Sequence, residues 1–254
     1  MPGSRLTESP PRMVSVGPVL LTGACESQLS APPISGGDGM KVRTPHDPII
    51  DEQLRPAEVD ELGPDAFLEG RLVTGGVLSE DPDLAELQGC RIAAASMAGT
   101  HWRRADIRHT SFEGTDLNNL TAEHASWSWV TVSDARMTGV SMRESGLTDV
   151  AVSRAKMATA SLRFCRLNRV AFTDCDLTGL DLTGSTLTDV SFTDCVLDQA
   201  QFHEVRCTRV RLAGCSLLEV GSLASLKGAH IRADDVDLIA RELARALGLV
   251  LEGR

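Results

Sequence analysis

Residues 170–194 read VAFTD-CDLTG-LDLTG-STLTD-VSFTD when they are divided into groups of five. The third residue of every group is large and apolar, and the first is small or apolar. Two apolar positions in every five residues fit neither the 3.6-residue period of a helix nor the two-residue alternation of a strand. This stretch therefore predicts a structure that repeats every five residues.

The five-residue period extends far beyond this stretch. Every fifth residue from Leu87 to Leu217 is apolar. With 42% apolar residues overall, such a run has a chance probability on the order of 10⁻¹⁰. The position two residues before each of them is mostly small or β-branched, from Ala85 to Cys215, and Val220 continues this column. The repeat therefore covers about residues 83–220.

The pattern resembles the pentapeptide-repeat family, whose unit reads roughly Ala, Asp or Asn, Leu and two variable residues. The resemblance is carried by units such as Ala105-Asp106-Ile107, Cys175-Asp176-Leu177 and Leu180-Asp181-Leu182. It implies an all-β fold, a right-handed quadrilateral parallel β-helix. In that family four units make one coil, and both the large and the small residue point inward.

Four units per coil would place residues twenty apart above one another, and the residue types agree with this spacing. Phe192 would lie above Phe172, and one small-residue column is valine throughout: Val130, Val150, Val170, Val190 and Val210. Successive coils should then lie about 4.8 Å apart, like strands in a sheet. We expect a rod built from stacked coils.

An outward column two residues after the large position alternates in charge. It reads Asp149, Arg169, Asp189 and Arg209. Ion pairs at a solvated surface contribute about 0–1 kcal/mol each. We therefore expect these side chains to be exposed and mainly to favour the correct register.

The chain divides into four predicted parts. They are a disordered or untranslated leader (1–49), a lead-in that caps the first coil (50–82), the β-helix (83–220), and a last partial coil with a C-terminal helix and tail (221–254). In the lead-in, Leu62, Phe67, Leu72 and Val77 keep the five-residue phase and are expected to face inward, but Pro82 and the glycines at 75 and 76 interrupt it.

The leader leaves two questions open. Met13 to Cys25 resembles a short signal-peptide core that ends at a cysteine, although Pro18 interrupts it. Met40 is an alternative start to Met1, and residues 1–39 are rich in Pro, Gly and Ser.

A C-terminal helix is expected to cover the open strand edges of the last coil. Asp234 and Asp235 are its predicted caps, Gly248 its stop, and its apolar positions are Val236, Ile239, Leu243 and Leu247. In family members that act on DNA gyrase, a C-terminal helix and tail form a dimer interface, and Leu249-Val250-Leu251 is similar to such a tail. Capping alone and capping with homodimerisation both remain open.

The chemistry-bearing residues do not form a recognisable reactive site. Cys207 falls on the large inward position. Five cysteines fall on the small inward position, namely Cys90, Cys165, Cys175, Cys195 and Cys215. These positions favour buried free thiols and a cytoplasmic location. Four histidines occupy scattered outward positions, namely His101, His109, His124 and His203. We predict no catalytic, cofactor-binding or metal-binding residues and no enzymatic activity.

Two outward aromatic residues, Trp129 and Phe164, form a possible contact patch, because aromatic side chains are enriched at protein interfaces. An equally open alternative is that Trp129 folds back onto the wall of the rod.

The sequence favours a non-enzymatic scaffold or protein-binding module whose partner is unknown. The alternative, by resemblance to fluoroquinolone-resistance members, is a DNA-mimicking protein that binds DNA gyrase. Residues 83–220 carry 17 acidic and 14 basic side chains, a net charge of −3, which is weak for a DNA mimic. Direct nucleic-acid binding is not expected. A second alternative is a lipid-anchored or secreted repeat protein, without a membrane-spanning segment.

Overall fold

The computed structural model describes residues 41–246, 248 and 249. The segment Met13 to Cys25, the choice between Met1 and Met40, Leu247 and the tail residues Val250 and Leu251 lie outside the described residues.

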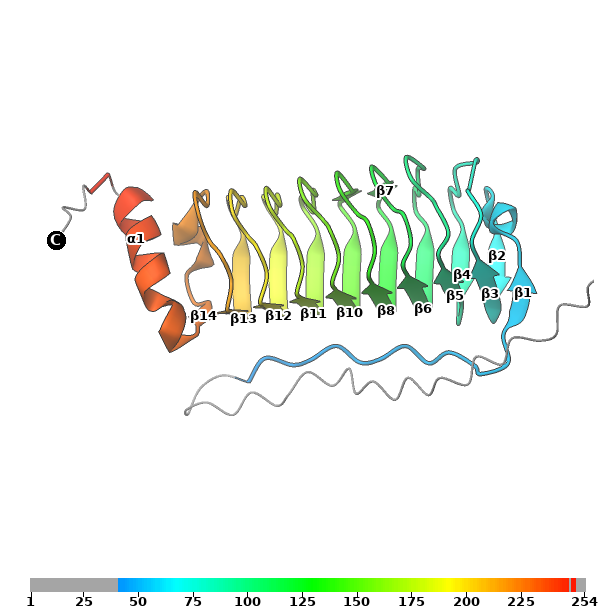
Figure 1. Ribbon diagram of the computed structural model, residues 1–254, viewed down its shortest axis with the longest axis horizontal. Coiled ribbons are helices and arrows are strands. Elements are labelled where there is room, and N and C mark those ends of the chain that lie inside the picture. The colour runs from blue at the N-terminus through cyan, green and yellow to red at the C-terminus, as the bar shows by residue number, and fades with distance from the viewer. Residues whose placement is uncertain (1–40, 247, 250–254) are drawn as a thin grey trace, which may run out of the picture. The chain divides into compact units, whose positions relative to one another are not determined.

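Residues 55–231 form a rod whose long strands lie side by side, with one coil following another along its axis (Figure 1). This is the predicted four-sided parallel β-helix. Its main sheet contains β1 (Arg55–Ala57), β2 (Phe67–Glu69), β3 (Arg71–Thr74), β4 (Glu86–Gln88), β5 (Arg91–Ala93), β6 (Asp106–Glu113), β8 (Ser126–Ser133), β10 (Gly146–Ser153), β11 (Arg166–Thr173), β12 (Thr186–Thr193), β13 (Arg206–Ala213) and β14 (His230–Ile231). A second sheet pairs β7 (Thr121–Glu123) with β9 (Ser141–Arg143). One α-helix, α1 (Val236–Ala246), and three short 3-10 turns complete the fold: η1 (Val59–Leu62), η2 (Leu223–Leu226) and η3 (Ala233–Asp235).

Strand register confirms the coil of twenty residues. Val150 of β10 pairs with Val170 of β11, which in turn pairs with Val190 of β12. The rings of Phe172 and Phe192 stack with their centroids 5.2 Å apart and their planes 5° from parallel. Identical side chains therefore fill equivalent places in successive coils.

The corners of each coil are made by the fifth residue of each five-residue unit. This residue adopts the left-handed conformation at corner after corner, for example φ 55° at Asp149 and φ 70° at Gly179. Glycine enters this region freely and Asp tolerates it, whereas a bulky residue is strained there. Two bulky aromatic residues nevertheless occupy corners, Trp129 with φ 55° and Phe164 with φ 58°.

In the lead-in, the predicted inward phase is wrong by one residue. Leu62 is buried as expected, but Phe67 and Val77 are 63% and 70% exposed and Leu72 is only half-buried. The residues that face inward are instead Leu68, Val73 and Leu78.

A shorter coil explains this shift. Phe67 of β2 pairs with Glu86 of β4, nineteen positions later rather than twenty, and Val73 likewise pairs with Ile92. After Leu78 the next buried position is Pro82, so one residue is missing from that unit. The lead-in is thus already part of the coil stack, because β1 pairs with β3 and β3 with β5.

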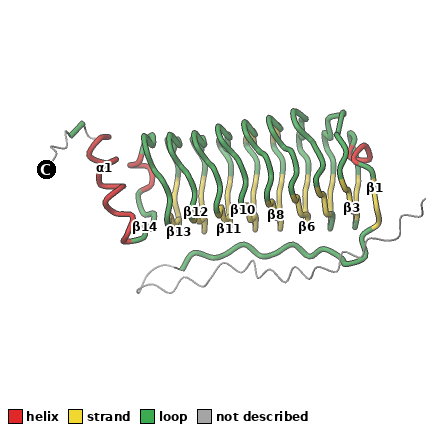
Figure 2. Tube along the Cα trace, viewed as in Figure 1, coloured by secondary structure: helices red, strands yellow, loops and turns green. Residues whose placement is uncertain are grey.

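Residues 41–49, which we name the strap, differ from the leader expected at these positions. They form no helix, strand or turn and follow one corner of the rod back towards β1 (Figures 1 and 2). Pro45 and Pro48 restrict the residues before them to extended conformations. Backbone N–H groups of the strap are bound by side chains of the rod, as described below.

The turn η3 and helix α1 cover the last coil, and each supplies one acceptor to its open edge. The Gly214 N–H donates to Asp235 Oδ2 (2.8 Å) and the Glu219 N–H to Glu242 Oε2 (2.9 Å). One coil earlier, the equivalent N–H groups of Asp194 and Gln199 donate to backbone carbonyls of the next coil. The two carboxylates therefore replace the carbonyls of a coil that is absent.

The predicted apolar face of α1 is only partly buried. Ile239 is 8% exposed, whereas Val236 and Leu243 are 53% and 42% exposed. The Asp235 carboxylate, predicted to cap its own helix, binds Gly214 and the Arg232 side chain. Among the described residues, no helix is long and apolar enough to cross a membrane.

Candidate interaction surfaces

One corner of the rod carries a column of polar and aromatic side chains, which we name the corner ladder. Its members are His109, Trp129, Asp149, Arg169, Asp189 and Arg209. Arg169 binds both carboxylate oxygens of Asp149 (2.7 and 2.6 Å), and Arg209 binds both oxygens of Asp189. The sequence predicted the pairing but not the burial, since Asp149 and Asp189 are each only 1% exposed.

The strap covers these carboxylates. The Arg43 N–H donates to Asp189 Oδ1 (3.1 Å), and the His46 N–H donates to Asp149 Oδ1 (3.1 Å). The His46 ring adds a second contact, with Nδ1 2.8 Å from the same oxygen. Each carboxylate is thus held between an arginine of the rod and a backbone donor of the strap.

A third contact has the same form without a carboxylate. The Ile49 N–H donates to His109 Nδ1 at 3.2 Å. The His109 ring stacks on Trp129, with the centroids 4.7 Å apart and the planes 12° from parallel. Trp129 is half-buried, and its ring lies against the His109 ring, which accepts the Ile49 N–H.

These surroundings lower the pKa of both carboxyl groups. Burial raises the pKa of Asp149, but Arg169 and the His46 N–H and ring outweigh it, so that the pKa lies below its ordinary value. Arg209 lowers the pKa of Asp189, burial acts against it, and the Arg43 N–H lowers it further. Both groups are therefore ionised when the strap is bound.

A pH dependence of stability follows from these lowered pKa values. The side chain of an unperturbed Asp has a pKa of about 3.9. Each carboxylate therefore makes its full contribution to the free energy of unfolding at pH values above this pKa. This contribution is lost as the pH falls through the lower, folded-state pKa. We expect the double variant Asp149→Asn/Asp189→Asn to lose less unfolding free energy than the wild type between about pH 6 and pH 2.5, in urea denaturation. Parallel pH profiles of the two proteins would contradict this assignment.

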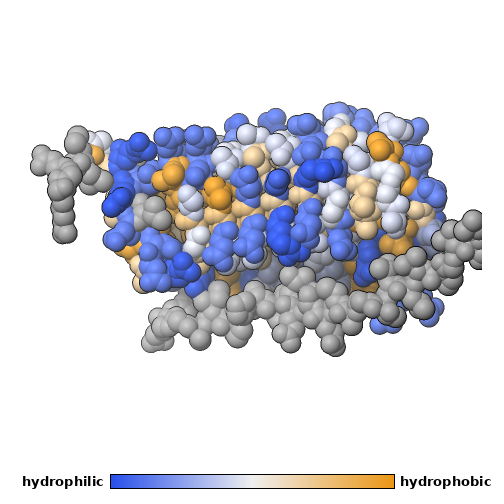
Figure 3. All heavy atoms as spheres, in the orientation of Figure 1, coloured by the Kyte–Doolittle hydropathy of each residue, from blue (hydrophilic) through white to orange (hydrophobic). Residues whose placement is uncertain are grey.

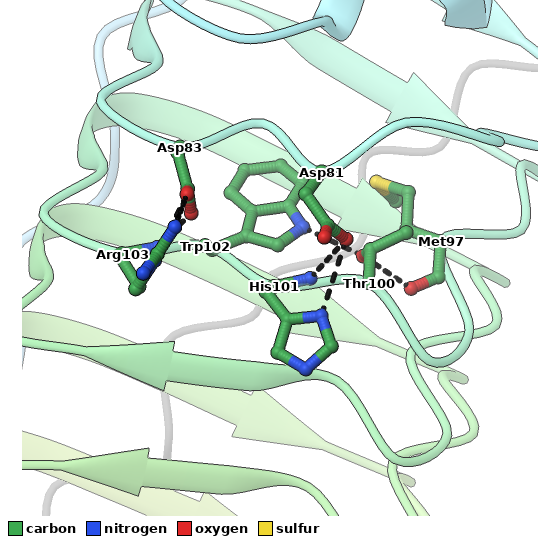
Figure 4. A network of polar contacts seen from close by, with 7 residues as sticks. All are labelled: Asp81, Asp83, Met97, Thr100, His101, Trp102 and Arg103. Carbon is green, nitrogen blue, oxygen red and sulfur yellow. Dashed lines mark hydrogen bonds and ion pairs between the residues drawn. The ribbon is translucent and has the colours of Figure 1, made fainter.

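A second polar network lies where the short coil of the lead-in meets the next coil and includes Asp81 and Asp83 (Figure 4). The residue between these two aspartates is the buried Pro82. Asp81 Oδ1 accepts the His101 N–H at 2.8 Å and lies 3.2 Å from the ring Nδ1. Asp83 accepts the Arg103 N–H and binds its guanidinium. The carboxylates thus bind two backbone donors of the next coil.

The same region contains a buried indole whose N–H group has a hydrogen-bond acceptor. Trp102 Nε1 donates to Thr100 Oγ1 (2.9 Å), and this hydroxyl donates to the Met97 carbonyl (2.7 Å; Figure 4). Ala122, next in the Trp102 column, is fully buried and small. A shallow hollow beside the network is lined by Asp83, Leu84, Arg103, Arg104 and His124.

Phe164 lies on a different corner from Trp129, so the structure does not bring the two predicted patch residues together. The side chain is 43% exposed, and the guanidinium carbons of Arg143 and Arg163 lie 5.9 and 5.5 Å from its ring centroid. Its neighbour in the next coil is Gly184, where a Cβ would come within 2.5 Å of the Phe164 ring. The ring therefore occupies space that a side chain at residue 184 would need.

The cysteines and histidines mostly occupy the predicted positions. All six described cysteines are free thiols; Cys207 is half-buried and the other five are buried. Burial raises the pKa of Cys165 to about 11. His101, His124 and His203 are exposed, whereas His109 is half-buried in the corner ladder.

Two segments of the repeat match models of a known protein family. Residues 85–119 match a model of pentapeptide repeats (eight copies), and residues 145–221 match a model described as a pentapeptide repeat region. No curated protein matches the sequence.

Three solved structures are similar to this chain at low identity. A trypsin-treated form of QnrB1, a plasmid-mediated fluoroquinolone resistance protein, is 16% identical over 73% of this chain and 90% of its own, with a TM-score of 0.40. HetL, a pentapeptide repeat protein involved in heterocyst differentiation regulation in Nostoc sp. strain PCC 7120, is 16% identical over 64% and 88%, with a TM-score of 0.25. Rfr23 from Cyanothece 51142 is 13% identical over 54% and 86%, with a TM-score of 0.26. At these identities the functions of the neighbours are not carried over to this chain.

Proposed function

Because the chain is a pentapeptide-repeat protein, we propose that it is a non-enzymatic scaffold that binds another protein through side chains on the outside of its rod. The face drawn in Figure 3 is hydrophilic along both margins, and hydrophobic residues of varying strength lie among polar ones across its middle. A partner would therefore recognise particular exposed residues rather than one broad apolar face.

The observation that carries this proposal is the partly exposed ring of Phe164 at a left-handed corner of the rod. A bulky residue with φ 58° is strained, and its ring is 43% exposed, so burial in the rod does not fully offset the strain. Arg143 and Arg163 flank the ring, and aromatic and arginine side chains are the types enriched at interface centres.

Affinity capture from the host with the full chain tests the proposal. Phe164→Asn removes the ring but suits the left-handed corner, so the rod should be at least as stable as the wild type. We expect a partner that the wild type retains and that Phe164→Asn loses. Val196→Asn, which replaces another exposed apolar residue (39% exposed), is the matched control and should retain the partner. Identical captured proteins for all three chains would contradict the role of Phe164.

The gyrase-binding DNA mimic stays the alternative function. It is less well supported, because many outward carboxylates are neutralised by an arginine one coil later. These pairs are Asp83–Arg103, Asp116–Arg136, Asp134–Arg154, Asp149–Arg169 and Asp189–Arg209. A supercoiling assay separates the two functions, and absence of inhibition or protection of gyrase at micromolar protein would remove the mimic.

Two further properties belong to the proposal. Homodimerisation through α1 is supported by the exposed Val236 and Leu243 on that helix. A cytoplasmic location is supported by the buried free thiols, which suit a reducing compartment.

A further inference from the structure

The strap meets the corner ladder at three points that have the same construction. At each point a ladder residue accepts one backbone N–H, and the ladder residue one coil later supports the acceptor. Arg209 supports Asp189, Arg169 supports Asp149, and Trp129 stacks on His109. The three acceptors are forty residues apart, which is two coils.

The spacing of the strap matches this two-coil interval. Its donors are residues 43, 46 and 49, each three residues after the previous one. Three residues of an extended polyproline-type chain span about 9.3 Å, and two coils span about 9.6 Å. A chain in this conformation can therefore place one N–H on every acceptor without accumulating an offset.

The strap sequence follows the same period of three. The residue before each donor is half-buried, namely Val42, Pro45 and Pro48. Proline fits these positions because it has no N–H to donate and favours the extended conformation. The site thus selects a segment in which an apolar residue or proline precedes each free N–H.

We propose that the corner ladder is a binding site for an extended, proline-containing segment of another protein, and that the strap is a built-in competitor that occupies it. This inference rests on the proposed protein-binding function and names the class of partner. The rod holds the acceptors in place by itself, because Arg169, Arg209 and Trp129 all belong to the rod.

The contacts of the strap favour exchange over permanent attachment. Hydrogen bonds to the ladder stabilise the bound strap, whereas the loss of conformational entropy of every ordered strap residue opposes binding. Nine strap residues share three such points, and the side chains of His46 and Ile49 are 70% and 79% exposed. The strap is thus held by few contacts, so a partner segment with the same spacing can displace it.

Peptide binding to the full chain tests the proposal. The probe is a fluorescein-labelled peptide with the sequence of residues 41–50, KVRTPHDPII, measured by fluorescence anisotropy. In the opened variant Arg43→Pro/His46→Pro the strap loses two donors, and the ladder is unchanged. We expect the probe to bind this variant at least tenfold more tightly than the wild type, because the competing strap no longer holds the site.

A matched variant places two prolines beside the donors instead. Thr44 and Asp47 donate no backbone hydrogen bond among the described residues, so Thr44→Pro/Asp47→Pro should keep the strap bound and the probe weak. Adding Asp149→Ala and Asp189→Ala to the opened variant should abolish probe binding. A probe with prolines at the positions of Arg43 and His46 should not bind.

Two results would overturn the proposal. One is a failure of the probe to bind the opened variant, although faster hydrogen exchange of the Ile49 amide shows that the strap is released. The other is equal binding of the probe with prolines at the donor positions. Either result leaves the Phe164-dependent capture experiment unaffected, so that failure of this site and failure of the protein-binding function can be told apart.

Discussion

The variant Leu177→Asp is expected to unfold the rod. Leu177 is fully buried, and its column neighbours Met157 and Leu197 are buried and apolar. Loss of the leucine side chain costs about 2–5 kcal/mol, and a carboxylate without a partner in an apolar interior adds several more. Their sum is comparable to the whole stability of a typical domain, about 5–15 kcal/mol. Circular dichroism during thermal and urea denaturation measures the effect.

Thr173→Asp is the control for this substitution. Thr173 is half-buried on the outside of the wall, and its register neighbours Ser153 and Thr193 are uncharged. A surface change of this kind usually alters the unfolding free energy by about 0.5 kcal/mol or less. Equal stability of the two variants would show that the inward phase of the repeat is assigned incorrectly.

The double variant Asp235→Ala/Glu242→Ala is expected to lose several kcal/mol and to self-associate. It leaves the Gly214 and Glu219 N–H groups without acceptors, at a cost of about 1–3 kcal/mol each when they stay buried. It also loosens α1 from the last coil, and an exposed strand edge pairs with other chains. Urea denaturation and concentration-dependent light scattering report the two effects.

The amide variant Asp235→Asn/Glu242→Gln separates hydrogen bonding from charge. It keeps a carbonyl oxygen at each position, so it should retain most of the stability and stay monodisperse at concentrations where the alanine variant associates. If both double variants behave alike, the two side chains do not seal the end of the rod.

The fold was predictable from the sequence because each coil repeats the same requirement for two inward residues. The valine column and the pair Phe172 and Phe192 defined both the twenty-residue coil and its register. The lead-in was not predictable in the same way, since one deleted residue before Pro82 shifts the phase without changing the apolar character of Phe67 or Val77.

The surfaces were harder to predict, because they depend on contacts between distant segments. The sequence pairs Asp149 with Arg169, but nothing local indicates that His46 covers them. The only signal was the spacing of Pro45 and Pro48, which gains meaning once the coil spacing is known. For α1, the apolar pattern predicted one buried face, whereas Asp235 and Glu242 make the hydrogen bonds to the last coil.

The match between strap and ladder restricts how this protein can change in length. One extra coil inserted between Asp149 and Asp189 would move these two acceptors out of step with residues 43 and 46, and no whole number of strap residues would restore both contacts well. Two extra coils would be compensated by three extra strap residues. Duplications in such a gene would therefore be tolerated in steps of forty codons in the rod together with nine nucleotides in the strap.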